Sequence, residues 1–239
     1  CTLKLDHLSI EEPRLNIRDV NLEVSAGEVI GLAGMEGSGQ RQFLRTISGL
    51  MRPVGGKILL DGADLTGKPY RNFINAGISY VPAARLEEGL IPGLTLAEHF
   101  ALLDKSQGFF VNHEKTQTTA QARIGDFFIK GTPESRIEEL SGGNQQRALL
   151  ALMHDPLKLI LVEHPTRGLD IESSIWIWSK LKERCKQGTA IIFISSDLEE
   201  VLHYSDRILV FFGGKVSQPI DATTTGVDQL GQLIGGKGW

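Results

Sequence analysis

Short, continuous apolar runs dominate the hydrophobic pattern of this chain. Runs of strand length occur at Glu28–Gly34, Ile78–Pro82, Leu157–Val162, Thr189–Ser195 and Arg207–Phe212. A continuous apolar run bounded by turn residues is typical of a strand buried on both faces. Segments with apolar residues at helical spacing separate several of these runs. The alternation predicts an α/β fold with a mostly parallel core sheet covered by helices on both faces.

The N-terminal part has a different pattern. Leu3, Leu5 and Leu8 lead into the strand-like stretch Val20–Val24 before the first apolar run. After the first helical segment, GGKILLDG (Gly55–Gly62) indicates a strand that ends in an Asp-Gly turn. We therefore expect an N-terminal antiparallel β subdomain beside the parallel sheet.

The middle of the chain is predicted to be helical. Leu94–Leu103 and Lys115–Phe128 have helical spacing, with Thr95 as N-cap and Glu98 completing a capping box. The polar segment Gln107–Thr119 is interpreted as a surface connection. This region predicts an inserted helical subdomain.

Three more helices are expected, at Gln145–Met153, Ile171–Lys186 and Leu198–Leu202. The apolar face of the second should carry Ile175, Trp178 and Leu181, and Trp176, on a different face, is available to contact a neighbour. The chain is then a single domain over residues 1–239, with a core at about 1–82 and 157–239 and a helical subdomain at about 94–156.

Composition narrows the class of protein. The chain has 239 residues, 41% hydrophobic and 23% charged, with a net charge of −4. These values are typical of a globular domain and give no nucleic-acid or membrane-surface signal. The two cysteines, Cys1 and Cys185, form no metal or disulfide pattern, and we see no signal peptide or apolar run of transmembrane length. Because the chain starts at Cys1 within a strand-like segment, we expect it to be a piece of a longer polypeptide.

The first candidate site is the glycine-rich stretch GMEGSGQR between a strand and a helix. Such a loop points backbone N–H groups and a helix N-terminus at an anion. The stretch departs from the phosphate-loop pattern G-x-x-x-x-G-K-[ST], so a turn without bound phosphate remains the alternative. The candidate nucleotide-binding residues are Gly34, Met35, Glu36, Gly37, Ser38, Gly39, Gln40 and Arg41.

A second anion-binding device is LSGGNQQR, Leu140–Arg147, which precedes a helix. Ser141, Gly142 and Gly143 place exposed N–H groups and a hydroxyl at that helix N-terminus. A single chain rarely folds two such devices onto one phosphate. The simplest interpretation is that this one serves a nucleotide held by another subunit.

The motifs in this order resemble those of the ATP-binding cassette (ABC) family. LSGGNQQR matches the family's signature. It is followed by one apolar strand that leads into PTRGLD and by a second apolar strand that ends in ISSDLEEV. The resemblance extends over essentially the whole chain and implies the P-loop NTPase fold of ABC ATPases. Together with GSGQR, these motifs are similar to the second, degenerate ABC domain of importers for simple sugars or nucleosides, and are closer to the nucleoside type. The resemblance implies that the signature residues act in trans: Leu140, Ser141, Gly142, Gly143, Asn144 and Gln145.

The phosphate loop departs from the family pattern at two positions. Gln40 stands in the place of the lysine that neutralises the terminal phosphates, and Arg41 in the place of the Ser or Thr that holds Mg²⁺. Gln40 carries no charge. Arg41 can either reach a phosphate or remain a solvated first-turn residue, but it cannot bind Mg²⁺.

The catalytic positions are also changed. Glu163 takes the place of the family's aspartate, so a water-mediated Mg²⁺ contact is still possible, and His164 takes the place of the catalytic glutamate. Ala83 replaces the Q-loop glutamine, and Ser196 replaces the switch histidine. An adenine-stacking aromatic is missing near Leu8 to Ile10, where Ile10 offers only apolar contact. Glu163, His164 and Ser196 are therefore catalytic positions in degenerate form.

The signature residues and the D-loop residue Asp170 are intact. The losses affect the elements that act on a domain's own nucleotide, whereas the elements offered to a partner's nucleotide remain. The resemblance thus implies a domain that binds ATP or ADP weakly, with weakened Mg²⁺ binding, and completes the active site of a partner ABC domain. The implied partners are a head-to-tail ABC domain in the same polypeptide and membrane permease subunits, at the cytoplasmic face of the membrane. Residues Arg85–Pro92 and Leu94 are candidates for permease contact or for packing within the helical subdomain.

Two other functions remain open. The chain could be a non-hydrolysing regulatory or structural module that senses nucleotide, and Gln40, Glu163 and His164 favour this for the isolated chain. It could also be a soluble ABC protein that acts on nucleic acid, but the absence of a basic patch argues against this. The histidines His99, His113, His154 and His203 lack metal-ligand spacing and are interpreted as structural or surface residues.

Overall fold

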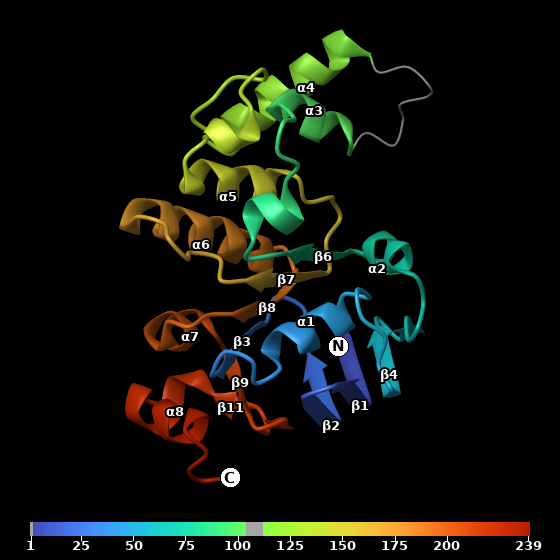
Figure 1. Cartoon of the computed structure of the whole chain (residues 1–239), viewed down its shortest axis with the longest axis vertical. Helices are drawn as coiled ribbons and strands as arrows, with labels where there is room; N and C mark the ends of the chain where they lie inside the picture. The colour runs from blue at the N-terminus through green and yellow to red at the C-terminus, as the bar shows by residue number, and fades with distance from the viewer. Residues whose placement is uncertain (1, 104–111) are drawn as a thin grey trace. The chain divides into compact units, whose positions relative to one another are not determined.

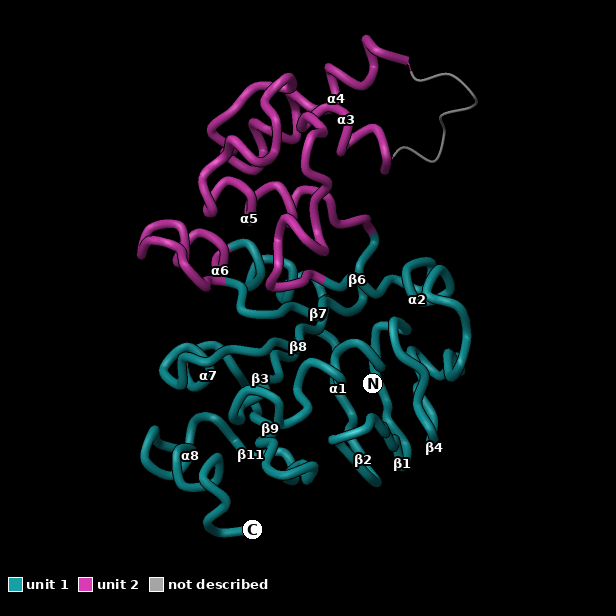
Figure 2. Tube along the Cα trace, in the orientation of Figure 1, with its two compact units in different colours: residues 1–80, 156–165, 180–239 teal, residues 81–155, 166–179 magenta. Residues whose placement is uncertain are grey.

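A computed structural model describes residues 2–103 and 112–239. Spatial contacts divide the chain into two compact units (Figure 2). Unit 1 comprises residues 1–80, 156–165 and 180–239, and unit 2 comprises residues 81–155 and 166–179.

Unit 1 contains two sheets. The antiparallel sheet has the order β2-β1-β4-β5, and the larger sheet has the order β10-β9-β3-β8-β7-β6 with β11 paired to β9. Strands β9, β3, β8 and β7 pair in parallel. The strands of the antiparallel sheet are β1 (Leu3–Glu12), β2 (Leu15–Val24), β4 (Gly55–Leu60) and β5 (Ala63–Asp64). Those of the larger sheet are β3 (Val29–Gly34), β6 (Ile78–Val81), β7 (Leu159–Glu163), β8 (Ala190–Ile194), β9 (Arg207–Phe212), β10 (Lys215–Val216) and β11 (Ile220–Asp221).

The strand patterns account for the two sheets. Strands β7 and β8 are buried at every position, as expected for parallel strands covered on both faces. Strand β2 alternates buried and exposed positions along much of its length, which suits a sheet with one solvated face. Strands β4 and β5 are joined by Asp61-Gly62, both at positive φ, as the Asp-Gly signal predicts. The expected mostly parallel core sheet and antiparallel β subdomain are both confirmed.

Helices cover the core sheet. Helix α1 contacts β3, β7 and β8 and also β1 of the antiparallel sheet, whereas α7 contacts β3 and α8 contacts β9 (Figure 1). The apolar side chains between these layers form one core, which includes Phe43 of α1 and Phe211 of β9 with ring centroids 5.6 Å apart. The helices with residues in unit 1 are α1 (Gln40–Ile47), α2 (Tyr70–Ala76), α7 (Leu198–Tyr204), α8 (Val227–Ile234) and part of α6 (Ile171–Lys186). A short 3-10 turn, Ala222–Thr224, precedes α8.

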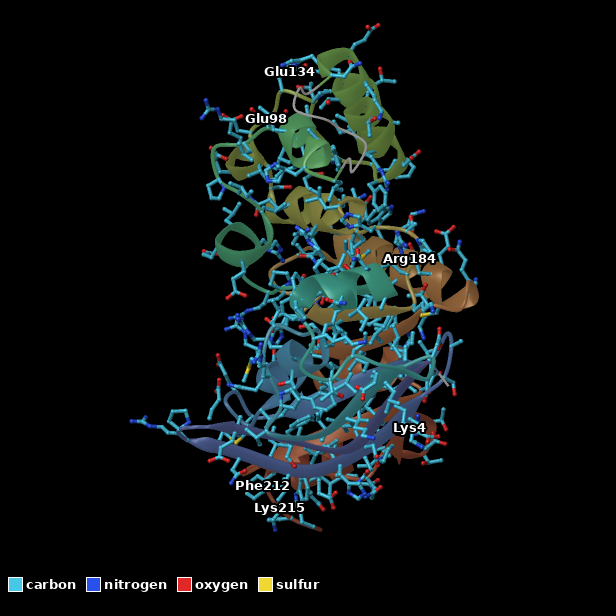
Figure 3. All side chains as sticks on the ribbon, turned by 90° about the vertical axis from the view of Figure 1, so that its right-hand side faces the viewer. Lys4, Glu98, Glu134, Arg184, Phe212 and Lys215 are labelled. Carbon is cyan, nitrogen blue, oxygen red and sulfur yellow. The ribbon has the colours of Figure 1, made fainter. Side chains whose placement is uncertain are left out.

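Unit 2 is predominantly helical. Helix α4 contacts both α3 and α5. The predicted capping box is present: Thr95 Oγ1 accepts from the Glu98 amide, and the Glu98 carboxylate accepts from the Thr95 amide at 2.7 Å (Glu98 is labelled in Figure 3). The helices are α3 (Leu96–Ala101), α4 (His113–Asp126), α5 (Gly142–Ala151), the first part of α6, a π-helical turn (Arg85–Gly89) and a 3-10 turn (Ile137–Glu139).

Two sequence-based predictions need correction. The segment Gln107–Thr119 is not a connection throughout, because α4 begins at His113; its first part lies outside the described residues. Ile175 is 60% exposed, whereas Ile177, Trp178 and Leu181 are buried. Ile175, Trp178 and Leu181 are spaced by three residues, which is less than the about 3.6 residues of a full helical turn. Over the two steps from Leu181 back to Ile175 the difference adds up, so Ile175 lies off the buried face.

Candidate functional site

The glycine-rich loop connects β3 to α1 in unit 1. Gly39 precedes the helix at φ 115°, a conformation open to glycine, and a Cβ there would lie 2.6 Å from Ile17 Cδ1. The Ser38 amide donates to Met35 O at 3.0 Å, and the Phe43 amide starts the helix by donating to Gly39 O. The sequence thus folds the expected strand, loop and helix N-terminus.

Gln40 is turned back over this loop. Its side chain is 5% exposed, and its Nε2 donates to Met35 O at 3.3 Å. A Cβ built on Gly34 would lie 2.4 Å from Gln40 Nε2, so the amide lies against the end of β3. Gln40, at the position of the family's lysine, therefore hydrogen-bonds to the backbone of its own loop. The sequence analysis did not predict this contact.

Arg41, Glu163 and Tyr80 form a cluster in unit 1. Arg41 Nε donates to Glu163 Oε1 at 3.2 Å, and the Tyr80 hydroxyl donates to the same oxygen at 2.5 Å. The Glu163 side chain is 3% exposed and that of Arg41 47% exposed. Burial, reinforced by the bond to Glu163, raises the pKa of the Tyr80 phenol well above its usual range. Arg41 is an exposed residue of the first turn of α1 that also forms an ion pair with Glu163, and its contact with a phosphate stays a prediction.

Tyr80 was missed by the sequence analysis. It belongs to β6, which is the neighbour of β7, and Glu163 is the last residue of β7. Its signal was its position near the carboxyl end of a strand of the α/β sheet, where functional groups gather.

His164 and Ser196 lie just after adjacent strands. Glu163 pairs with Ile194 in the β7–β8 register, so the residues that follow these strands emerge at the same edge of the sheet. His164 has φ 45°, an uncommon value for a non-glycine residue, and its amide donates to Ile194 O at 2.8 Å. Ser196 is exposed. The structure therefore brings the three positions predicted as catalytic to the end of the sheet where α1 begins.

Two other positions from the sequence analysis are Ile10 in unit 1 and Ala83 in unit 2. Ile10 is fully buried, so it cannot present an apolar surface to a base, and that part of the expectation is wrong. Ala83 lies in unit 2, and its methyl group can neither donate nor accept a hydrogen bond.

The Q-loop segment of unit 2 is partly turned inward. Arg85 Nε donates to Gln146 Oε1 at 2.7 Å, and its Nη2 donates to Arg167 O at 2.6 Å. Leu90 is 4% exposed whereas Ile91 is 50% exposed. The sequence analysis left two interpretations for this segment, permease contact and packing within the helical subdomain. Leu90 packs within the unit, whereas Ile91 is accessible to a partner.

The signature segment forms the N-terminus of α5, in unit 2. Ser141 is the exposed N-cap, and its Oγ accepts from the Asn144 side-chain amide at 2.9 Å. Asn144 Oδ1 in turn accepts from the Lys130 amide at 2.9 Å. Gln145 is 8% exposed, and its side-chain amide donates to Leu140 O at 3.0 Å. This buried hydrogen bond holds the backbone that precedes Ser141.

Asp170 caps the following helix of the same unit. Its carboxylate accepts from the Ser173 amide and from Ser173 Oγ, both at 2.9 Å. These two donors hold the pKa of Asp170 below its ordinary value. The D-loop carboxylate is therefore fixed in position by neutral donors while it remains exposed.

A cavity of about 520 Å³ opens beside Ser141 and Asp170 within unit 2. Arg147 lies over the Trp176 ring, 4.0 Å from its centroid, and Phe127 and Phe128 contact the same ring edge to face. Trp176 thus packs against aromatic and cationic side chains of this chain, and its contact with a neighbour stays a prediction. Phe128, Arg147 and Trp176 line this cavity. Because they are far apart along the sequence, no local pattern predicted that they would lie together.

The prediction that His99 is a structural residue is confirmed. It is 3% exposed, its Nδ1 bonds to Thr95 O at 2.8 Å, and its Nε2 accepts from the Ile91 amide at 2.9 Å. Across residues 2–103 and 112–239, no group of three or more His, Cys, Asp or Glu side chains could hold a metal ion. No helix in the same ranges is both long and apolar enough to span a membrane.

Solved structures identify the fold as that of an ATP-binding cassette. The ATP-binding subunit of an ABC transporter matches with a TM-score of 0.80 at 22% identity, covering 98% of this chain and 100% of that one. A dimeric ATP-binding cassette in a post-hydrolysis state, bound to ADP and Pi, matches with a TM-score of 0.76 at 23% identity, covering 92% and 98%.

The sequence places the chain in a family. The ABC transporter family model matches residues 17–167, so the chain belongs to the ABC transporter family. It is 34% identical to the nucleoside import ATP-binding protein NupA of Lactococcus lactis over 98% of this chain and 48% of that protein. It is also 34% identical to the arabinose import ATP-binding protein AraG of Pseudomonas syringae, over 95% and 45%, and to the ribose import ATP-binding protein RbsA of Streptococcus agalactiae, over 93% and 46%. The chain thus spans about half the length of the curated relatives it matches.

Proposed function

We propose that this chain is the degenerate ABC domain of an importer for nucleosides or simple sugars. Its relatives are import ATP-binding proteins, each about twice its length, which fits one polypeptide with two ABC domains. Such a domain would work at the cytoplasmic face of the membrane, together with permease subunits. The chain would then be a single nucleotide-binding domain of a longer protein.

The observation that carries the proposal is the contrast between the two helix N-termini. At α5, Ser141 is exposed and precedes Gly142 and Gly143, whose first-turn N–H groups have no acceptor within the helix. At α1, the Gln40 amide and the Arg41 guanidinium contact groups of their own unit. The α5 N-terminus therefore suits the γ-phosphate of an ATP held by a partner domain. Its donors would stabilise the charge that develops on that phosphate during hydrolysis.

The chain's own loop plays a lesser part in this proposal. It binds ATP or ADP weakly, because no lysine faces the terminal phosphates. It does not hydrolyse ATP, because His164 lacks the fixed negative charge of the family's catalytic glutamate. Hydrolysis takes place at the partner's loop, and reopening of the pair drives the permease.

The test is the ATPase rate of the assembled two-domain protein with its permease, carrying Ser141→Arg. A bulky cation at this N-cap removes the hydroxyl and obstructs closure on the partner's γ-phosphate, so the rate should fall about 100-fold. The matched control is Ser179→Arg, which adds the same charge at an exposed position of α6 and should leave the rate unchanged. An unchanged rate for Ser141→Arg would reject the proposal in favour of a regulatory module that only senses nucleotide.

A further inference from the structure

The Mg²⁺ place of the glycine loop holds side chains that do not fit Mg²⁺. This ion requires oxygen ligands in a near-ideal octahedron. Arg41, at the position of the hydroxyl ligand, has five N–H donors and no acceptor. Glu163, at the position of the family's aspartate, offers an oxygen that already accepts from Arg41 and from Tyr80.

Burial makes this arrangement hard to displace. A carboxylate that is 3% exposed is costly to leave without a positive partner, and the Arg41 guanidinium supplies that partner. A metal ion that took Glu163 Oε1 as ligand would have to displace Arg41 and Tyr80 from that oxygen. It would then stand beside a guanidinium of the same charge sign.

Arg41 is the cation that remains at this helix N-terminus. In the first turn of α1, residues 40–43, it is the single charged residue, and the Gln40 amide is committed to Met35 O. Its bond to Glu163 fixes the plane of the guanidinium at the end of β7, while 47% of the side chain stays exposed. A fixed, planar, exposed guanidinium is suited to phosphate oxygens.

We infer that Arg41, anchored by Glu163 and Tyr80, replaces Mg²⁺ in this site, so that the loop binds the phosphates of a nucleotide without metal. This inference rests on the proposed function, because it assumes that the loop is a nucleotide site. It adds that the ligand is free nucleoside di- or triphosphate rather than its Mg²⁺ complex. The partner's site and this site then differ in the ion they need.

The experiment measures the affinity of the full chain for a fluorescent ATP analogue in excess Mg²⁺ and in excess EDTA. Metal-free binding predicts that the two Kd values agree within about twofold. With Mn²⁺ in place of Mg²⁺, electron paramagnetic resonance should show no protein-dependent change in the Mn²⁺–ATP spectrum. The double variant Arg41→Ser/Glu163→Asp restores oxygen ligands of the family type, so its Kd should become at least about tenfold lower with Mg²⁺ than with EDTA.

Arg45→Ser is the matched control, because it removes the same charge one turn further along α1 and should leave the Kd ratio of the wild type unchanged. Tighter binding by the wild type in Mg²⁺ would overturn the inference and leave the proposed function intact. Absence of binding in both buffers would also overturn it, and the Ser141→Arg experiment would still decide the role of α5. The wild-type ratio tests the inference even if the double variant does not fold.

Discussion

In unit 1, the buried Glu163 is held by the charged Arg41 and the phenol of Tyr80, whereas in unit 2 the exposed Asp170 is held by the neutral amide and hydroxyl of Ser173. Glu163 ends strand β7 and Asp170 ends a loop, and each lies next to a glycine-preceded or glycine-rich helix N-terminus of its own unit. The first carboxylate is paired with the loop's own cation. The second leaves the α5 N-terminus beside it free of ion pairs among the described residues.

Under the proposed function, this difference indicates how one domain can lose hydrolysis at its own loop and keep its signature functional. Losing hydrolysis at the chain's own loop does not require the loop to unfold, because Arg41 and Glu163 satisfy each other. Keeping the signature functional requires only that Ser141 and the following glycines stay accessible. Selection could therefore act on the two regions separately.

The largest effect that would test this comparison comes from adding one carboxylate to each region. Gly142→Asp places a negative charge in the first turn of α5, where a Cβ would lie 3.4 Å from Arg85 Nη1 and therefore fits. The charge favours the helix but repels the partner's γ-phosphate. We expect the ATPase rate of the assembled transporter to fall about 100-fold.

Gly37→Asp is the counterpart in the loop of unit 1. No atom lies within 4 Å of a Cβ at Gly37, and aspartate tolerates the positive φ found there. We expect the ATPase rate to change by about threefold at most, because the proposed function assigns no hydrolysis to this loop. Equal losses in the two variants would show that the regions contribute alike and would break the comparison.

Sequence reasoning recovered most of the fold. Helix α6 has the predicted bounds Ile171–Lys186, and the capping box of Thr95 and Glu98 is present. These features depend on local patterns: apolar spacing, turn residues and first-turn hydrogen bonds. Ile175 was placed on the wrong face because spacing alone defines the buried stripe only to within a residue or two.

The candidate site was harder to predict, for a physical reason. The replacements Gln40, Arg41 and Glu163 could be read individually from the sequence, but their contacts join residues far apart along the chain. Arg41 and Glu163 are 122 positions apart, and Tyr80 adds a third strand. Their roles at a nucleotide, and that of Ser141, remain predictions.

A smaller effect is expected on stability in unit 1. Arg41→Met leaves the buried Glu163 with the Tyr80 hydroxyl but without its cation. Because Arg41 is half exposed, we expect the free energy of unfolding in urea to fall by about 1–3 kcal/mol, less than for a fully buried pair. Adding Glu163→Gln should recover about 1 kcal/mol of this loss, since the uncompensated charge is then gone. A double-mutant cycle with no coupling would show that the contact has no energetic role.

The smallest effect concerns Asp170, whose pKa is lowered by the Ser173 amide and hydroxyl. Because the folded-state pKa lies below the unfolded value of about 3.9, this carboxylate stabilises the fold above about pH 4, and the contribution is lost as the pH falls through the folded-state pKa. Asp170→Asn keeps a capping side chain but does not titrate. The melting temperature of the wild type should therefore exceed that of Asp170→Asn at neutral pH, and the gap should close as the pH falls below about 4 and through the folded-state pKa. Ser173→Ala removes the hydroxyl donor and should narrow the gap at neutral pH. If the difference in melting temperature did not change with pH, the contribution of Asp170 to stability would come from its hydrogen bonds as a cap and not from its charge.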